Sequence, residues 1–213
     1  GAPLPDGVIL WTRVTPTPAA RSGSGLGPVT GVIWEMARDE SFGAIVASGT
    51  VSTSADTDHT VKVDVTGLAT NTRYAYRFRV ASGPAAGVVS PVGYTRTAPA
   101  PAADVSRIRF GVVSCSNWEA GYFGAYRHLR AHRALTAIVH LGDYFYEYET
   151  GGYTGKSGVV RPTSPTNETV TLRDYRIRHA QYKTDPDLAE LHRMLPWICT
   201  WDDHESANDS WRG

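Results

Sequence analysis

The sequence predicts two domains, an all-β sandwich followed by an α/β domain. Residues 8–97 contain six short β-branched or aromatic runs separated by Gly, Pro, Ser, Asn and Asp, with no helical periodicity between them. After residue 104, buried-type strands alternate with helical spacing, which is typical of parallel βαβ units. We therefore expect a β-sandwich at residues 1–97, a linker at residues 98–104 and part of an α/β domain at residues 105–213.

The runs of the first domain are VILWTRV, GVIWEMARD, IVASGTVS, TVKVDV, YAYRFRVA and VVSPVGYTRT. Such regularly spaced runs favour a small antiparallel sandwich of the fibronectin type III or immunoglobulin-like kind. The stretch VTGLATNTRYAYRF resembles the tyrosine corner of fibronectin type III domains, where a tyrosine hydroxyl bonds back to the turn backbone. Tyr74 or Tyr76 would be that tyrosine; the alternative is that both are ordinary strand aromatics.

The second domain begins after the Pro/Ala-rich linker TAPAPAAD. The strand RIRFGVVSCSN, a helix in YFGAYRHLRAH and the strand TAIVHLGD make one βαβ unit. Residues 151–171, rich in Gly, Ser, Thr and Pro, predict a long surface loop of the kind that often covers a site. Two helices, in LRDYRIRHAQYKT and DPDLAELHRML, precede a last strand in PWICTWDDHE, and Asp185 and Pro186 supply the second helix's N-cap and first position.

Composition narrows the class of protein. The 21 basic and 21 acidic residues cancel, which argues against a nucleic-acid-binding surface or a polybasic membrane patch. No apolar run approaches the length of a membrane-spanning helix, and two cysteines are not a disulfide framework. The chain opens almost directly into a strand without a leader, and both ends look cut, so the missing leader says little about compartment.

Polar residues collect where the predicted strands of the second domain end, in SCSN, GDYFY and DDHE. Ligands of open α/β sheets bind outside the carboxyl ends of the strands, so these residues are expected on one rim. They are Cys115, Asp143, Tyr146, Asp202, Asp203, His204 and Glu205. Gly142 would let the chain turn sharply and approach closely, with Asp143 and Tyr146 on the same side.

A cation is the simplest account of this rim, because anionic side chains at one point otherwise repel each other. Carboxylates alone would suit calcium or magnesium. A thiolate and a phenolate beside a carboxylate suit a more acidic ion, with ferric iron the natural candidate.

Four stretches together resemble the PhoD-like alkaline phosphatases: PDGVILWTRV, SCSN with GYFGAYRHL, VHLGDYFYEYE and WDDHESAND. This family is a branch of the calcineurin-like metallophosphoesterases, related at the site to purple acid phosphatases. The resemblance covers nearly the whole chain and implies the family's N-terminal sandwich and the first part of its metallophosphoesterase domain. It implies hydrolysis of phosphate monoesters or diesters, phospholipid headgroups included, by a metal-bound hydroxide. It further implies a bacterial secreted, periplasmic or cell-surface protein, and we expect a monomer.

The resemblance also implies a ligand set for two metal ions. Cys115 and Tyr146 would ligate Fe3+, and Asp143 would bridge the iron to a second ion, usually Ca2+. Asp203 would hold the second ion, and Asn208 would line its site.

Substrate handling and the remaining ligands follow from the same resemblance. His204 would lie beside the substrate phosphate as an acid or an orienting donor. The family's other ligands, in His-rich and Asp-containing motifs nearer its C-terminus, are absent from these 213 residues. We therefore expect this chain alone to be a poor catalyst or none.

Several of these residues could have a structural role instead of a functional one. Cys115 could be a small buried residue or pair with Cys199, which we expect in the core of its strand. Asp202 could be purely structural, and Glu205 is expected to orient His204. Mid-strand His140 is expected to be a satisfied core histidine. The histidines of the predicted helices are expected on the surface: His128, His132, His179 and His192.

Other function classes stay open at this point. The chain could be a sandwich-type binding module with a degenerate α/β half. It could be a thiol hydrolase in which His204 and Asp203 activate Cys115, although this leaves Asp143 and Tyr146 unexplained. Within the resembled family, a phospholipase D-like phosphodiesterase is the alternative to an alkaline phosphatase.

Overall fold

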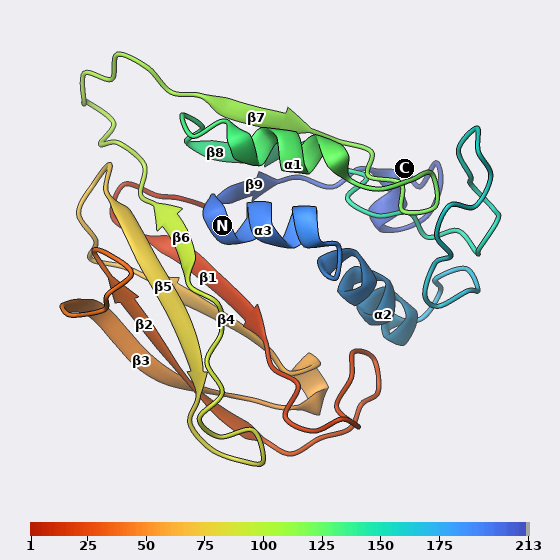
Figure 1. Cartoon of the computed structure of the whole chain (residues 1–213), viewed down its shortest axis with the longest axis horizontal. Helices are drawn as coiled ribbons and strands as arrows, with labels where there is room; N and C mark the ends of the chain where they lie inside the picture. Colours follow the sequence, from red (N-terminus) through yellow and green to blue (C-terminus); the bar gives the residue numbers. More distant parts are fainter. Residues whose placement is uncertain (212–213) are drawn as a thin grey trace. The chain divides into compact units, whose positions relative to one another are not determined.

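The computed structural model describes residues 1–211 and divides into two compact units. The first unit comprises Gly1–Ile108 and Arg193–Pro196, and the second comprises Arg109–His192 and the chain from Trp197 onward. Figure 1 shows that strands dominate the first unit, whereas helices and strands alternate in the second. Within residues 1–211, none of the helices has the length and apolar character needed to cross a bilayer.

Each of the six predicted β-runs of the first unit contains a strand. These strands are β1 (Val8–Arg13), β2 (Thr30–Ala37), β3 (Ile45–Thr53), β4 (Thr60–Val65), β5 (Arg73–Val80) and β6 (Gly93–Arg96). β1 and β4 form a two-stranded antiparallel sheet, and the order β3-β2-β5-β6 forms a four-stranded antiparallel sheet. A short 3-10 helix, η1 (Ala55–Thr57), precedes β4.

The first unit is built on alternation along its strands. In β4, Val61, Val63 and Val65 are buried while the residues between them face solvent. Buried side chains of both sheets belong to one core cluster, so the two sheets pack as layers around it. The Tyr74 hydroxyl accepts a hydrogen bond from the backbone N–H of Ala69 at 2.9 Å. Of the two candidate tyrosines, Tyr74 therefore makes the predicted bond to the turn.

The second unit contains the predicted βαβ pattern. Its elements are β7 (Phe110–Val113), α1 (Gly124–Ala131), β8 (Ala137–His140), α2 (Leu172–Lys183), α3 (Pro186–Met194), β9 (Trp197–Cys199) and the 3-10 helix η2 (Asp203–Glu205). The three strands are parallel in the order β7-β8-β9. Their carboxyl ends consequently meet at one edge.

Side chains fix where the helices begin. Thr171 and Asp174 form a reciprocal capping box at the start of α2. Asp185 accepts the backbone N–H groups of Asp187 (3.0 Å) and Leu188 (3.1 Å), so it caps α3 as predicted.

Two predictions about buried residues had different outcomes. His140 is fully buried: its Nδ1 accepts the Gly142 N–H at 3.3 Å, and its Nε2 lies 3.3 Å from the Ser116 hydroxyl. The prediction of a satisfied core histidine is confirmed. Cys199, expected in the core, is instead an exposed free thiol; of the three residues of β9, only Trp197 is buried. Cys115 is also free, so no disulfide joins the two.

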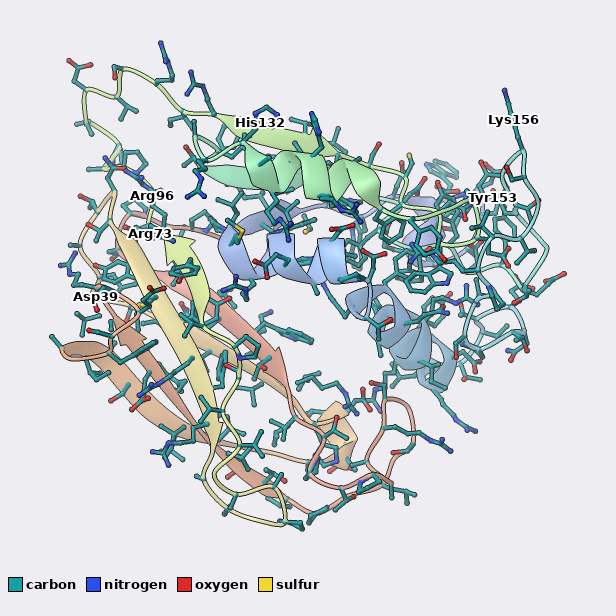
Figure 2. The ribbon with its side chains drawn as sticks, viewed as in Figure 1. Asp39, Arg73, Arg96, His132, Tyr153 and Lys156 are labelled. Carbon is teal, nitrogen blue, oxygen red and sulfur yellow. The ribbon has the colours of Figure 1, made fainter. Side chains whose placement is uncertain are left out.

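Residues 151–171 form a long loop, as predicted, with only an isolated bridge between Gly155 and Gly158. Figure 2 shows Lys156 of this loop pointing away from the ribbon. Arg178 of α2 is fully buried and ties the loop down. Its guanidinium donates to the carbonyl oxygens of Ser164 (3.2 Å), Pro165 (2.9 Å), Asn167 (3.3 Å) and Tyr146. The loop is therefore joined to the segment that follows β8.

Candidate metal centre

The chain turns sharply after β8, at Gly142. Its φ is +110°, and a Cβ there would lie 2.6 Å from both the Cβ and the backbone N of Asp202. Only glycine fits this position without a shift. Asp143 follows in the left-handed region at φ +52°, as does Cys115 at φ +58°. Two candidate ligands therefore lie on strained backbone, as is common at functional sites.

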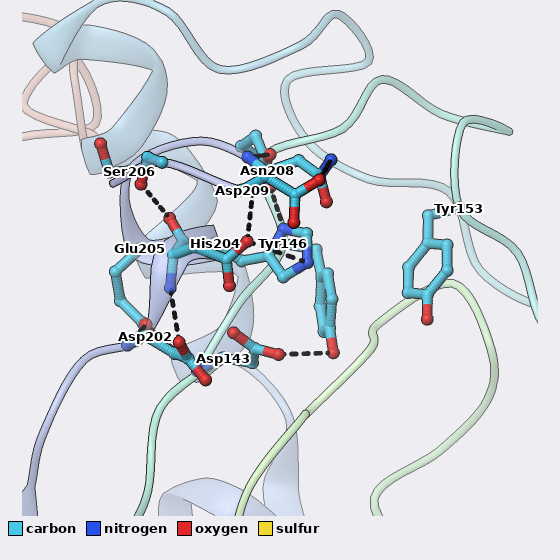
Figure 3. A network of polar contacts seen from close by, with 12 residues as sticks. Asp143, Tyr146, Tyr153, Asp202, His204, Glu205, Ser206, Asn208 and Asp209 are labelled. Carbon is cyan, nitrogen blue, oxygen red and sulfur yellow. Dashed lines mark hydrogen bonds and ion pairs between the residues drawn. The ribbon is translucent and has the colours of Figure 1, made fainter. Parts of the chain in front are cut away.

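Asp143, Tyr146 and Cys115 meet at the ends of β7 and β8. The Tyr146 hydroxyl donates to Asp143 Oδ2 at 3.1 Å (Figure 3). Burial raises the pKa of Tyr146 far above its usual value, and the adjacent Asp143 and Cys115 raise it further through their charges and hydrogen bonds. Without a cation the phenol is therefore neutral. It can bind as a phenolate only where a strong Lewis acid takes the place of its proton.

Asp203 and His204 of η2 also approach Asp143, and Cys115 is not part of this second group. One ligand atom from each of Asp143, Asp203 and His204 lies within 4.8 Å of the others. Asp143 Oδ1 is buried and has no hydrogen-bond partner within residues 1–211. An orphaned carboxylate oxygen beside a second carboxylate and an imidazole is costly unless a cation coordinates it. The side chains present therefore fit a metal ion.

Glu147, which the sequence analysis missed, orients His204. It is buried, and its carboxylate lies 2.8 Å from His204 Nδ1 and accepts the Asn208 backbone N–H at 2.5 Å. The neutral tautomer with its proton on Nδ1 leaves the Nε2 lone pair facing Asp203, whose Oδ2 is 4.0 Å away. Burial lowers the pKa of His204, but Glu147, Asp203 and Asp143 outweigh it and raise the pKa overall.

Glu205 does not orient His204, contrary to the sequence-based expectation. Its carboxylate accepts the backbone N–H groups of Asp143 (3.1 Å), Asp202 (2.6 Å) and Tyr144. The 3-10 turn of η2 directs Glu205 back toward the strand ends and so couples the end of β8 to the segment after β9. In the sequence, Glu147 is recognisable as a glutamate four residues after Asp143. Glu205 is directly adjacent to His204 and was therefore the more obvious candidate.

The remaining predicted residues have local roles. Asp202 caps η2 by accepting the Asp203 N–H at 3.0 Å, which agrees with the purely structural role considered for it. The Asn208 side chain donates to Asp209 at 3.1 Å. The Asp209 N–H donates to Asp203 Oδ2 at 2.5 Å and lowers the pKa of that carboxyl, which keeps Asp203 ionised.

Comparisons with known proteins support the resemblance. Residues 1–99 match the family model described as PhoD-like phosphatase, N-terminal domain, and residues 110–213 match that described as PhoD-like phosphatase. Alkaline phosphatase D of Bacillus subtilis (strain 168) is 44% identical over 209 residues, which cover 98% of this chain and 34% of that protein. The chain thus spans about a third of this relative's length.

Solved structures agree with this similarity. The structure titled "Structure of PhoD" has a TM-score of 0.89 at 44% identity and covers 98% of this chain and 38% of that chain. Purple acid phosphatase PPD1 from yellow lupin seeds has a TM-score of 0.58 at 13% identity, covering 94% of this chain and 33% of that one. The second likeness concerns the fold alone.

Proposed function

Because this chain belongs to the PhoD-like phosphatase family, we propose that it forms part of a metal-dependent phosphoric ester hydrolase. One observation carries the proposal: the buried, unpartnered Asp143 Oδ1 converges with Asp203 and His204. Hydrolysis of phosphate esters needs such a centre, because charge on the phosphoryl oxygens must be neutralised while water attacks.

Two ions are proposed for this centre. Cys115, Tyr146 and Asp143 would hold Fe3+. Asp143 would also bind the second ion, which is divalent and proposed to be Ca2+. Asp203 and Asn208 are the proposed further ligands of the second ion. When bound, the ions supply Lewis acidity that lowers the pKa of water and neutralises phosphoryl oxygens.

The chain's own groups perform the orienting and proton-handling steps. Glu147 holds the His204 ring through Nδ1, so Nε2 is the atom that faces the reacting region. Protonated at Nε2, His204 can donate to a phosphoryl or leaving-group oxygen; unprotonated, it can accept a hydrogen bond from water. Glu205 holds the Asp143 backbone through its N–H, which fixes the direction of that carboxylate.

The structure offers less support for a thiol hydrolase. Such an enzyme would need the Cys115 thiol paired with a base. The Tyr146 hydroxyl instead interacts with both Cys115 and Asp143, an arrangement that suits one shared ion. We therefore retain the metallophosphatase as the proposed function.

Finer assignments are proposals by family resemblance. They comprise the fibronectin type III-like identity of the sandwich, the domain bounds 1–97 and 105–213, a secreted or cell-surface bacterial location, and a monomeric state. Monoester and diester hydrolysis are both proposed for the whole protein, and we propose that residues 1–213 alone turn over slowly or not at all.

The test compares two aspartates of the same rim. In the whole protein, Asp143→Asn should abolish hydrolysis of chromogenic phosphate mono- and diesters and remove bound metal by elemental analysis. Asp202→Asn, which keeps a side-chain oxygen able to cap η2, should retain most of both. Equal losses in the two variants would remove Asp143 from the centre of the site.

A further inference from the structure

Two tyrosines flank His204 beside the candidate metal centre. Tyr153 comes from the 151–171 loop, and its ring centroid lies 6.4 Å from that of His204 with the planes only 18° apart. Tyr148 lies 5.4 Å from His204 and 5.5 Å from Tyr153. Tyr146 lies 5.1 Å from Tyr153. The imidazole that faces the reacting region is therefore bordered by aromatic rings.

The position of Tyr153 is fixed by bonds to the turn that follows Cys115. Asn117 donates its Nδ2 to the Tyr153 carbonyl oxygen at 2.8 Å. The buried Glu119 carboxylate accepts the Gly151 N–H at 3.0 Å, and the Glu119 carbonyl accepts the Val160 N–H at 2.9 Å. Loop residues on both sides of Tyr153 are thus held to one turn.

Tyr153 nevertheless keeps much of its ring available. The residue is 48% exposed, and within residues 1–211 the structure gives its hydroxyl no hydrogen bond. Figure 3 shows the hydroxyls of Tyr146 and Tyr153 pointing to the same side, but only Tyr146 is bonded to Asp143. A large aromatic held in place while half-exposed offers a fixed face to a ligand, because little side-chain freedom remains to be lost on binding.

Resting on the proposed function, we propose that Tyr153, supported by Tyr148, contacts the alcohol part of the phosphate ester and favours esters with a flat apolar group there. The phosphoryl end would lie at Asp143, Asp203 and His204, so the group esterified to it extends toward the rings bordering His204. Ring contacts of this kind are worth about three- to tenfold in affinity.

The test uses the whole protein loaded with ferric and calcium ions. The probes are inorganic phosphate, methylphosphonate and phenylphosphonate, which resemble the ester but resist hydrolysis. Tyr153→Ala should weaken phenylphosphonate about three- to tenfold and leave the other two probes within about twofold. Tyr153→Phe should retain phenylphosphonate binding. Tyr122→Ala, at an exposed tyrosine whose ring lies over Arg161, should change none of the affinities.

The outcomes separate this inference from the function beneath it. If all variants bind phosphate and Tyr153→Ala leaves the ratio of phenylphosphonate to methylphosphonate affinity unchanged, the inference alone is overturned. No phosphate binding to the metal-loaded whole protein would overturn the proposed function, and the inference with it. If Tyr153→Ala loses the binding of all three probes and Tyr153→Phe loses none, the ring serves the packing of the site. That result would also overturn the inference.

Discussion

Replacing Glu147 by Gln is expected to loosen the candidate metal centre without removing a ligand. The carboxylate is buried and accepts two N–H donors, from His204 Nδ1 and the Asn208 backbone. A glutamine offers one carbonyl oxygen, and its NH2 group faces the second donor. One buried donor is then unsatisfied, which costs about 1–3 kcal/mol.

The same range follows from metal chemistry. Groups that orient a ligand typically change metal affinity by about 10–100-fold, equivalent to about 1.4–2.7 kcal/mol. We therefore expect Glu147→Gln to raise the dissociation constant for Mn2+, used as a divalent probe in titration calorimetry, by about 10–100-fold. In 15N NMR of the metal-free chain, the His204 tautomer should shift away from the form protonated on Nδ1.

Glu149→Gln is the matched control. It removes the same charge two residues along, at an exposed position, and should leave both the Mn2+ affinity and the His204 tautomer nearly unchanged. If the two variants bind Mn2+ alike, only total charge matters, and the assignment of Glu147 as the group that orients His204 is wrong.

Three further predictions concern the same unit. Gly142→Ala should lower the free energy of unfolding in urea by about 1–3 kcal/mol, because its Cβ meets Asp202 at positive φ; an unchanged midpoint would contradict this. Burial lowers the pKa of His140 to about 4. As the pH falls, the unfolded chain therefore takes up a proton on His140 before the folded chain does. The contribution of neutral His140 to the free energy of unfolding is complete above pH 6.5. It is lost as the pH falls toward 4, with a loss of about 2 kcal/mol at pH 5. His140→Asn should reduce this loss of stability between pH 6.5 and pH 4. An equally steep loss in the variant would exclude His140 as its source. In the iron-loaded whole protein, Tyr146→Phe should remove a visible tyrosinate-to-iron band; a persisting band would remove Tyr146 from the ligands.

The sequence predicted the strands of both units well, because alternation in runs such as TVKVDV directly encodes burial on one face. It also predicted the rim, since parallel strands place their carboxyl ends together. Side-chain direction within the rim was harder. The 3-10 turn of η2 sends Glu205 to backbone amides, and a residue from a different segment, Glu147, reaches His204 instead. Adjacency in sequence was a poor guide to contact there.

Local exposure was the other source of error. Cys199 lies among apolar residues, which suggested a core position. Burial of a strand residue depends on what covers each face, and no periodicity reports that. Within residues 1–211, Ile198 and Val112 of this sheet are also exposed, at 42% and 60%.

The buried guanidinium of Arg178 couples the stability of the 151–171 loop to that of α2. Its carbonyl partners lie in the 151–171 loop and in the segment after β8, whereas the arginine belongs to α2. The loop therefore loses several of its backbone hydrogen-bond partners whenever α2 unfolds. In hydrogen exchange, amides of residues 163–170 should open at least as readily as those of α2, and a substitution that destabilises α2 should speed exchange in both segments.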